Sequence, residues 1–211
     1  MHIFVNGVKT LKQFQQLEGL GISYGGIVFI PSLQDGSEDE AKAAEFEGGD
    51  WEVKKVGVFA DAEADFIFGK IDEFGLDLVL LHGNESPVFC EKISGDIETI
   101  KTFRIDDQSI QPIDYQIKDY DDSCDYYLFE NVNAVGIPNN QSLNFLRRLA
   151  KSKIEKPFFL GGDILPDDAT QIKSFSHPDF FGVMLDRLFD KKPGVKDMSL
   201  ILKFREELRM V

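Results

Sequence analysis

Several side chains that can bind a ligand or carry a proton stand where apolar, strand-like runs end. Asn6 follows the run HIFV, His82 ends the run LDLVLLH, and Glu130 ends the run CDYYLFE. An amide forms hydrogen bonds but takes up no proton near neutral pH, so Asn6 cannot act as a base. A carboxyl group can carry a proton, and one that ends a barrel strand is expected at the mouth of the pocket.

Two further carboxylates, Asp163 and Asp186, follow later apolar runs. If these two groups converge with Glu130, the three carboxylates could bind Mg²⁺, Ca²⁺ or a cationic small molecule. More ordinary interpretations stand beside the chemical ones. Asn6 begins an Asn-Gly turn sequence, and His82 could be a core histidine satisfied by the backbone.

Glycine and cysteine give weaker signals. Gly161 and Gly162 are more typical of a turn than of an anion cradle, because a lone glycine pair has low specificity. Cys90 and Cys124 lie far apart, with no C-x-x-C or Cys/His cluster. We therefore expect buried thiols, with neither a disulfide framework nor a metal site.

Strand-like and helix-like segments alternate along the chain and must position these residues. The apolar runs typical of strands are residues 2–5, 25–30, 54–60, 76–82, 97–105, 124–130, 156–162 and 180–185. Helical periodicity marks residues 10–20, 62–74, 86–93, 142–151, 167–175 and 198–210, several of which begin at Thr, Asp or Ser. Residues 106–122 are less regular and predict only a loop or a short helix.

Nearly continuous apolar strands indicate burial on both faces, as in a parallel sheet covered by helices. Eight strands with helices between them predict an α/β fold, a single-domain (β/α)8 TIM barrel over residues 1–211. Periodicity alone leaves an open doubly wound sheet as the competing architecture.

Charge and composition restrict the partners. The formal net charge of −14 disfavours nucleic acid and anionic membranes, because there is no basic surface to neutralise phosphates. No apolar run approaches the length of about 20 residues that a membrane helix needs. The strand pattern starts at the first residues without a secretory leader, so the cytoplasm is the expected compartment.

Several segments, taken in order, resemble the phosphoribosylanthranilate isomerases of tryptophan biosynthesis, which are small single-domain barrels. The matching segments are NGVKTLKQFQQLEGLG, GGIVFIP, KVGVFAD, LVLLHGNESP, YYLFEN, LPDDA, FGVML and KPGVKD. They cover nearly the whole chain, and KVGVF, LHGNE and PGVKD at this spacing are the most specific of them.

The resemblance implies an Amadori rearrangement by one general acid and one general base, with no metal and no cofactor. The family base is a Cys that ends the first strand, and Asn6 stands at that position. The family acid is an Asp that ends the sixth strand, and Glu130 stands there. This comparison implies that the base has been lost, whereas the acid is kept as a carboxyl one methylene longer.

The resemblance also identifies a set of substrate-binding positions. They are Gly7, His82, Gly83, Gly161, Gly162, Asp163, Asp186 and Arg187. Family members hold the substrate phosphate with Gly- and Ser-rich turns, because small residues let backbone N–H groups point at the anion.

Here the turn after the sixth strand contains Ile137 and Pro138, and Asp163 and Asp186 fall near the phosphate position. These two carboxylates are expected to repel a phosphate, and Arg187 could offset part of that repulsion if it turns inward. Asp35 stands where the family has an Arg, and no other cationic group is expected at the mouth.

These observations predict a family member that binds a small molecule in the barrel mouth, as a monomer or homodimer, and whose ordinary isomerase activity is weak or lost. One alternative is a non-catalytic binding or regulatory barrel. The other is an enzyme of changed specificity that uses the acidic pocket.

Overall fold

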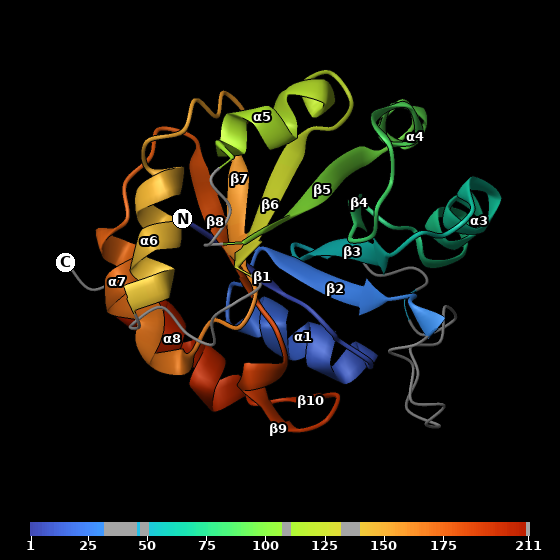
Figure 1. The fold of residues 1–211 in the computed structure, drawn as a ribbon. Coiled ribbons are helices and arrows are strands. Elements are labelled where there is room, and N and C mark those ends of the chain that lie inside the picture. The colour runs from blue at the N-terminus through green and yellow to red at the C-terminus, as the bar shows by residue number, and fades with distance from the viewer. Residues whose placement is uncertain (32–45, 47–50, 107–110, 132–139, 210–211) are drawn as a thin grey trace.

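The computed structural model describes residues 1–31, 46, 51–106, 111–131 and 140–209. Eight parallel strands form a closed barrel in their order along the chain (Figure 1). These strands are β1 (His2–Val5), β2 (Tyr24–Val28), β3 (Lys54–Phe59), β4 (Leu78–Leu81), β5 (Glu98–Ile105), β6 (Tyr126–Asn131), β7 (Phe158–Gly161) and β8 (Phe180–Leu185).

Helices surround the barrel as an outer ring (Figure 1). They are α1 (Leu11–Gly19), α3 (Ala64–Phe74), α4 (Pro87–Ser94), α5 (Ile113–Ile117), α6 (Asn140–Leu149), α7 (Ala169–Ser174) and α8 (Met198–Arg209). Short 3-10 turns occur at η2 (Lys118–Tyr120), η3 (Pro166–Asp168) and η4 (Arg187–Phe189). Among the described residues no helix is long and apolar enough to cross a membrane.

Closure distinguishes the two architectures that periodicity left open. β8 pairs with β1 in parallel, with Phe4 opposite Met184, so the eight-stranded sheet has no edge. A doubly wound sheet would leave two edge strands. The predicted (β/α)8 TIM barrel is therefore confirmed.

Two apolar layers fill the fold. One lies inside the barrel and consists of Phe4, Tyr24, Ile30, Val56, Val58, Leu78, Leu80, Ile100, Leu128, Phe159 and Met184. The other packs the outward faces of the strands against the helices. Because side chains on a strand alternate between its faces, strands buried on both faces read as continuous apolar runs.

Local signals set several element boundaries. The Thr10 hydroxyl accepts a hydrogen bond from the Gln13 N–H at 3.2 Å and begins α1. The Ser86 hydroxyl does the same for the Phe89 N–H at 3.3 Å and begins α4. Gly75 ends α3 in the left-handed conformation at φ 57°. These contacts satisfy helix-end groups that have no partner within the helix.

Two elements refine the sequence prediction. The irregular stretch before β6 holds the short helix α5, as one of the two predicted options. A hairpin of β9 (Asp190–Lys192) and β10 (Val195–Lys196) was not predicted. Its turn contains Pro193 and Gly194, and Gly194 has φ +74°, so the Pro-Gly pair was the missed signal.

Candidate active site

Strand alternation places one layer of polar side chains at the carboxyl end of the barrel. The interior cluster contains Phe4, Leu80, Leu128 and Met184. Two positions further along the same strands, or just past their ends, stand Asn6, His82, Glu130 and Asp186. A two-residue step keeps a side chain on the same face, so these four predicted site residues share the barrel mouth.

Asn6, after β1, contacts Asp186, which follows the neighbouring strand β8. Its side chain is buried, and its Nδ2 donates a hydrogen bond to Asp186 Oδ2 at 3.2 Å. Its backbone N–H donates to the Leu185 carbonyl at 2.8 Å. The Oδ1 atom is buried and has no hydrogen-bond partner within the described chain. The amide therefore bridges β1 and β8 and leaves one acceptor unused.

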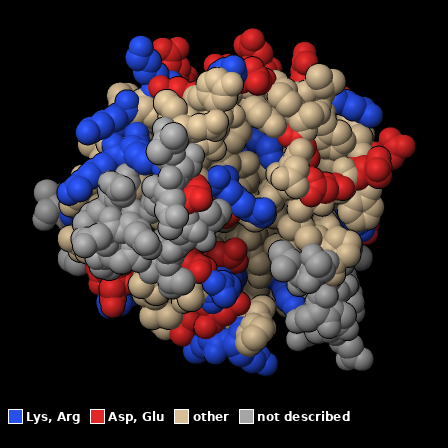
Figure 2. All heavy atoms as spheres, in the orientation of Figure 1, with Lys and Arg blue, Asp and Glu red and all other residues tan. Residues whose placement is uncertain are grey.

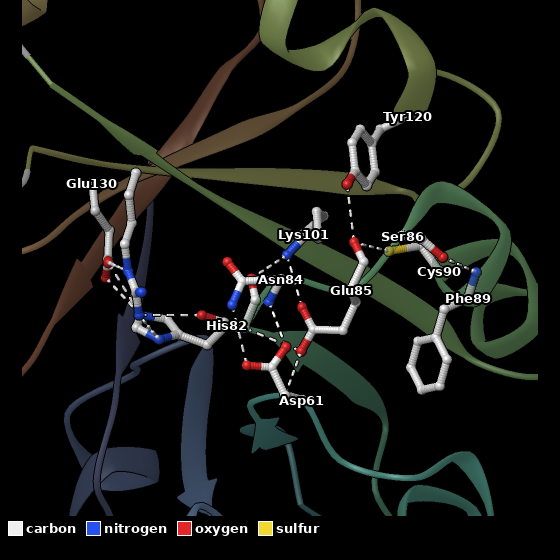
Figure 3. Close-up of polar contacts among 12 residues, drawn as sticks. Asp61, His82, Asn84, Glu85, Ser86, Phe89, Cys90, Lys101, Tyr120 and Glu130 are labelled. Carbon is white, nitrogen blue, oxygen red and sulfur yellow. Dashed lines mark hydrogen bonds and ion pairs between the residues drawn. The ribbon is translucent and has the colours of Figure 1, made fainter.

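Glu130 and His82 point toward one another (Figure 3). His82 Nε2 lies 3.1 Å from both carboxylate oxygens of Glu130. Arg104 from β5 contacts both residues, with Nη2 2.9 Å from His82 Nδ1 and Nε 3.9 Å from Glu130 Oε2. His82 is thus paired with two charged side chains, and the interpretation of it as a core histidine satisfied by the backbone is wrong.

Asp163 and Arg187 form an ion pair between the segments that follow β7 and β8. Arg187 Nη2 lies 2.6 Å from Asp163 Oδ2, and Nε lies 3.1 Å from Oδ1. The hydrogen bonds that Arg187 donates to the Asp163 carboxylate raise the pKa of the guanidinium. The arginine side chain is 70% exposed, so the pair is solvated and neutralises Asp163 without burying it.

Three of the predicted glycine positions have clear backbone reasons. A Cβ on Gly83 would lie 2.5 Å from the Asp61 backbone nitrogen, so only glycine allows the β3 and β4 loops to approach. Gly7 has φ +77°, which side-chain-bearing residues rarely adopt. Gly162 likewise has φ +91°. The structure thus accounts for these glycines by turn geometry, and a ligand contact at them stays a prediction.

The buried ion pair between Lys101 and Glu85 contacts the backbone of the loop that follows β4 (Figure 3). Lys101 Nζ lies 2.8 Å from Glu85 Oε2, and each side chain is 3% exposed. Glu85 Oε1 also accepts hydrogen bonds from the N–H groups of Asp61 and Gly83, at 2.9 and 3.0 Å. Lys101 Nζ donates to the Gly83 carbonyl at 2.8 Å. These contacts hold the backbone next to His82.

Both cysteines are free and buried, as predicted. Burial raises the pKa of the Cys90 thiol to about 11 and that of Cys124 to about 12. Neither thiol lies among the polar side chains at the barrel mouth, because both belong to the apolar layer between the strands and the helices. They offer no substitute for a thiolate base.

The expectation that no further cationic group lies at the mouth is wrong, because Arg104 reaches it from β5. Periodicity could have identified Arg104, since it lies four residues after the interior Ile100. A Cβ on Gly7 would lie 3.4 Å from Lys196 Nζ, so Lys196 approaches the mouth from the hairpin. Its ammonium group lies 2.6 Å from Asp190 Oδ1 and is almost fully buried.

A hollow of about 510 Å³ lies beside Lys196, between the start of α1 and the β9–β10 hairpin. Five lysines line it: Lys9, Lys12, Lys191, Lys192 and Lys196. In Figure 2, Lys and Arg side chains gather along the lower edge, where Figure 1 places β9 and β10. A chain of net charge −14 therefore carries a locally cationic surface beside its barrel mouth.

The three carboxylates proposed as a possible metal site bind separate partners. Glu130 contacts His82, Asp163 pairs with Arg187, and Asp186 accepts from Asn6. Within the described ranges no group of three or more His, Cys, Asp or Glu side chains could hold a metal ion. The predictions about Asp35, Ile137 and Pro138 fall outside the described residues.

Comparison with known proteins gives a consistent result. The sequence model of the family described as N-(5'-phosphoribosyl)anthranilate (PRA) isomerase matches residues 4–207. The N-(5'-phosphoribosyl)anthranilate isomerase of Parabacteroides distasonis is 30% identical, with 99% of this chain and 93% of that protein covered. The corresponding enzyme of Phocaeicola vulgatus is 27% identical, with 99% and 98% covered.

Solved structures show the same fold. Phosphoribosyl anthranilate isomerase from Thermotoga maritima superposes with a TM-score of 0.78 at 20% identity, covering 99% of this chain and 98% of that one. The Thermus thermophilus structure gives 0.76 at 21% identity, with the same coverage. The match over residues 4–207 is decisive: this chain belongs to the N-(5'-phosphoribosyl)anthranilate isomerase family of tryptophan biosynthesis.

Proposed function

We propose that the chain binds a phosphoribosylanthranilate-like small molecule in its barrel mouth and isomerises it weakly or not at all. The observation that carries this proposal is Asn6, a buried amide hydrogen-bonded to Asp186. The resemblance of the first strand to the family assigns the base to this position. A base must accept a proton, and an amide does not do so near neutral pH.

Glu130 is the proposed acid. It is the second-last residue of β6, its side chain is 12% exposed, and both of its oxygens contact His82 Nε2. A replacement base would have to be water or another carboxylate. Asp186 is the candidate carboxylate, because its Oδ2 lies 3.2 Å from the Asn6 amide that occupies the base position.

The charged side chains near the mouth favour an anionic ligand more than the sequence analysis predicted. Arg187 forms an ion pair with Asp163, and Asp186 accepts a hydrogen bond from the neutral amide of Asn6. Arg104 and the lysine-lined hollow add positive charge near the mouth. One structural relative is described as a complex with reduced 1-(o-carboxyphenylamino)-1-deoxyribulose 5-phosphate, which makes that compound a suitable probe.

Turnover of N-(5'-phosphoribosyl)anthranilate by the purified protein tests the proposal. Removal of one positioned acid or base typically lowers the rate by about 10²- to 10⁴-fold. We expect turnover at least a hundredfold below that of the Parabacteroides distasonis relative, and Asn6→Cys should raise it. Turnover within tenfold of the relative would contradict the proposal.

Growth of a tryptophan auxotroph that lacks this isomerase provides a second readout. Wild-type protein should complement poorly, and Asn6→Cys combined with Glu130→Asp should complement better. Failure of the double variant, with the barrel folded, would assign the defect to the phosphate-binding turns as well.

A non-catalytic binding barrel is the second candidate, and the paired mouth carboxylates favour it. Calorimetry with the reduced deoxyribulose phosphate distinguishes the two. Binding without measurable turnover in wild type or in Asn6→Cys would favour the binding barrel. Native mass spectrometry of the same sample determines whether the protein is a monomer or a homodimer, both of which the proposal allows, as it does a cytoplasmic location.

A further inference from the structure

Arg104 makes a set of contacts that a merely solvated arginine would not make. Its Nη2 lies 2.9 Å from His82 Nδ1 and 3.2 Å from the His82 carbonyl oxygen. Its Nε lies 3.9 Å from Glu130 Oε2. The arginine therefore reaches from β5 to the residue after β4 on one side and to β6 on the other.

The hydrogen-bonding inventory of arginine determines the direction of these contacts. A guanidinium group has only donors, so His82 Nδ1 must accept its hydrogen bond. The ring proton of a neutral His82 then lies on Nε2, which faces both oxygens of Glu130. We propose that Arg104 is a positioning residue that selects the Nε2–H tautomer of His82 and so directs an N–H group at Glu130.

The surrounding structure fixes both partners of this contact. On β5, Lys101 faces outward and pairs with Glu85, whereas Arg104 faces the mouth. The Lys101–Glu85 pair holds Gly83 through its N–H and its carbonyl, one residue after His82. His82 N–H donates to the Phe59 carbonyl at 2.7 Å. The imidazole is thus held by its backbone and by both ring nitrogens.

This arrangement gives Glu130 a donor that does not depend on solvent. If Nδ1 lost its partner, the free imidazole could carry its proton on either nitrogen, and the tautomer with a bare Nε2 would set a lone pair against the carboxylate. Arg104 removes that alternative. The tautomer claim stands on geometry alone, and its catalytic consequence rests on the proposed role of Glu130 as the acid.

Nitrogen-15 NMR of the imidazole rings tests the proposal at neutral pH, because protonated and bare ring nitrogens give well-separated signals. The chain has three histidines, and His82→Gln assigns the relevant pair of signals. In wild type we expect protonated Nε2 and bare Nδ1. In Arg104→Met the two signals should move toward each other as the tautomers mix, and Arg104→Lys, which keeps a donor, should restore most of the separation.

Arg147→Met is the matched control, because Arg147 is an exposed arginine on α6. It should leave the His82 signals unchanged. A wild-type His82 protonated on Nδ1, or signals that Arg104→Met leaves in place, would overturn the proposal. The wild-type measurement decides the first point even if a variant fails to fold.

Kinetics with N-(5'-phosphoribosyl)anthranilate separate this inference from the proposed function. A tautomer change in Arg104→Met supports the positioning role even if neither the wild type nor the variant turns over the compound. Absence of turnover in both counts only against catalysis. Measurable wild-type turnover with an unchanged tautomer would overturn the positioning role alone.

Discussion

At the scale of single residues, burial decides what a charge contributes. Lys101 and Glu85 are each 3% exposed, whereas Lys54 and Glu98 form a 3.7 Å pair at 50% and 48% exposure. A buried charge that loses its partner cannot recover the hydration it gave up, but an exposed one can. The two pairs consist of the same chemical groups and differ in burial, so they provide an internal comparison.

Lys101→Met should lower the free energy of unfolding by about 3–5 kcal/mol, because Glu85 would remain buried without its cation. Lys54→Met should change it by less than about 1 kcal/mol, as for other exposed pairs. Urea unfolding followed by circular dichroism measures both. Equal effects of the two substitutions would contradict the role assigned to the buried pair.

At the scale of elements, the loops at the barrel mouth depend on close backbone approach. A Cβ on Gly83 would lie 2.5 Å from a backbone atom of Asp61, whereas one on Gly69, inside α3, would have nothing within 4 Å. An added methyl group would therefore clash with backbone at Gly83 and point into open space at Gly69. Helix termini also differ: Thr10 caps α1 with its side chain, whereas Glu63 at the start of α3 makes no such bond.

Gly83→Ala should destabilise the protein by about 1–3 kcal/mol, because the backbone atom it meets cannot move aside as a flexible side chain would. Gly69→Ala should stabilise it by roughly 0.5–1 kcal/mol through the lower entropy cost of alanine in a helix. Thermal unfolding of both variants gives the sign directly. Destabilisation by Gly69→Ala would show that α3 does not tolerate the methyl group.

Thr10→Ala should cost about 1 kcal/mol, because the Gln13 N–H would lose its side-chain acceptor. Glu63→Ala removes no capping bond and should change stability by less than about 0.5 kcal/mol. Chemical denaturation distinguishes the two. A Thr10→Ala variant as stable as wild type would mean that the hydroxyl adds nothing to α1.

At the scale of the whole molecule, barrel closure creates two dry layers, and the thiols lie in the outer one. Cys90 and Cys124 have pKa values raised from 9.0 to about 11 and about 12, chiefly by burial. The folded state therefore retains both thiol protons at pH values where the unfolded chain has released them. The associated stability is complete below pH 9 and is lost as the pH rises toward 11 and 12.

The free energy of unfolding should consequently fall above pH 9, by up to about 1.4 kcal/mol per pH unit for each thiol. The double variant Cys90→Ala, Cys124→Ala should show a shallower slope in the same range. Urea titrations at several pH values between 8 and 10.5 measure the difference. Identical slopes would contradict the assignment of this pH dependence to the two thiols.

The alternation of apolar runs and helical segments predicted the α/β class, eight strands and most helix boundaries, because period and capping are local properties of the chain. Closure of the sheet into a barrel was decided by the pairing of β8 with β1. The same pattern put Asn6, His82 and Glu130 at strand ends, and the carboxyl ends of parallel strands in a barrel share one mouth. The Pro-Gly hairpin between Asp190 and Lys196 was also readable in principle.

Only the tertiary structure decided which charges meet. Arg104 and His82 are 22 positions apart, and Glu130 lies 48 positions beyond His82, so no local pattern relates them. Asp163 likewise pairs with Arg187 and Asp186 with Asn6, so two carboxylates that had no partner in the sequence pattern have one in the structure. Side-chain partners depend on strand register and barrel closure, which are properties of the assembled sheet and are absent from any single segment.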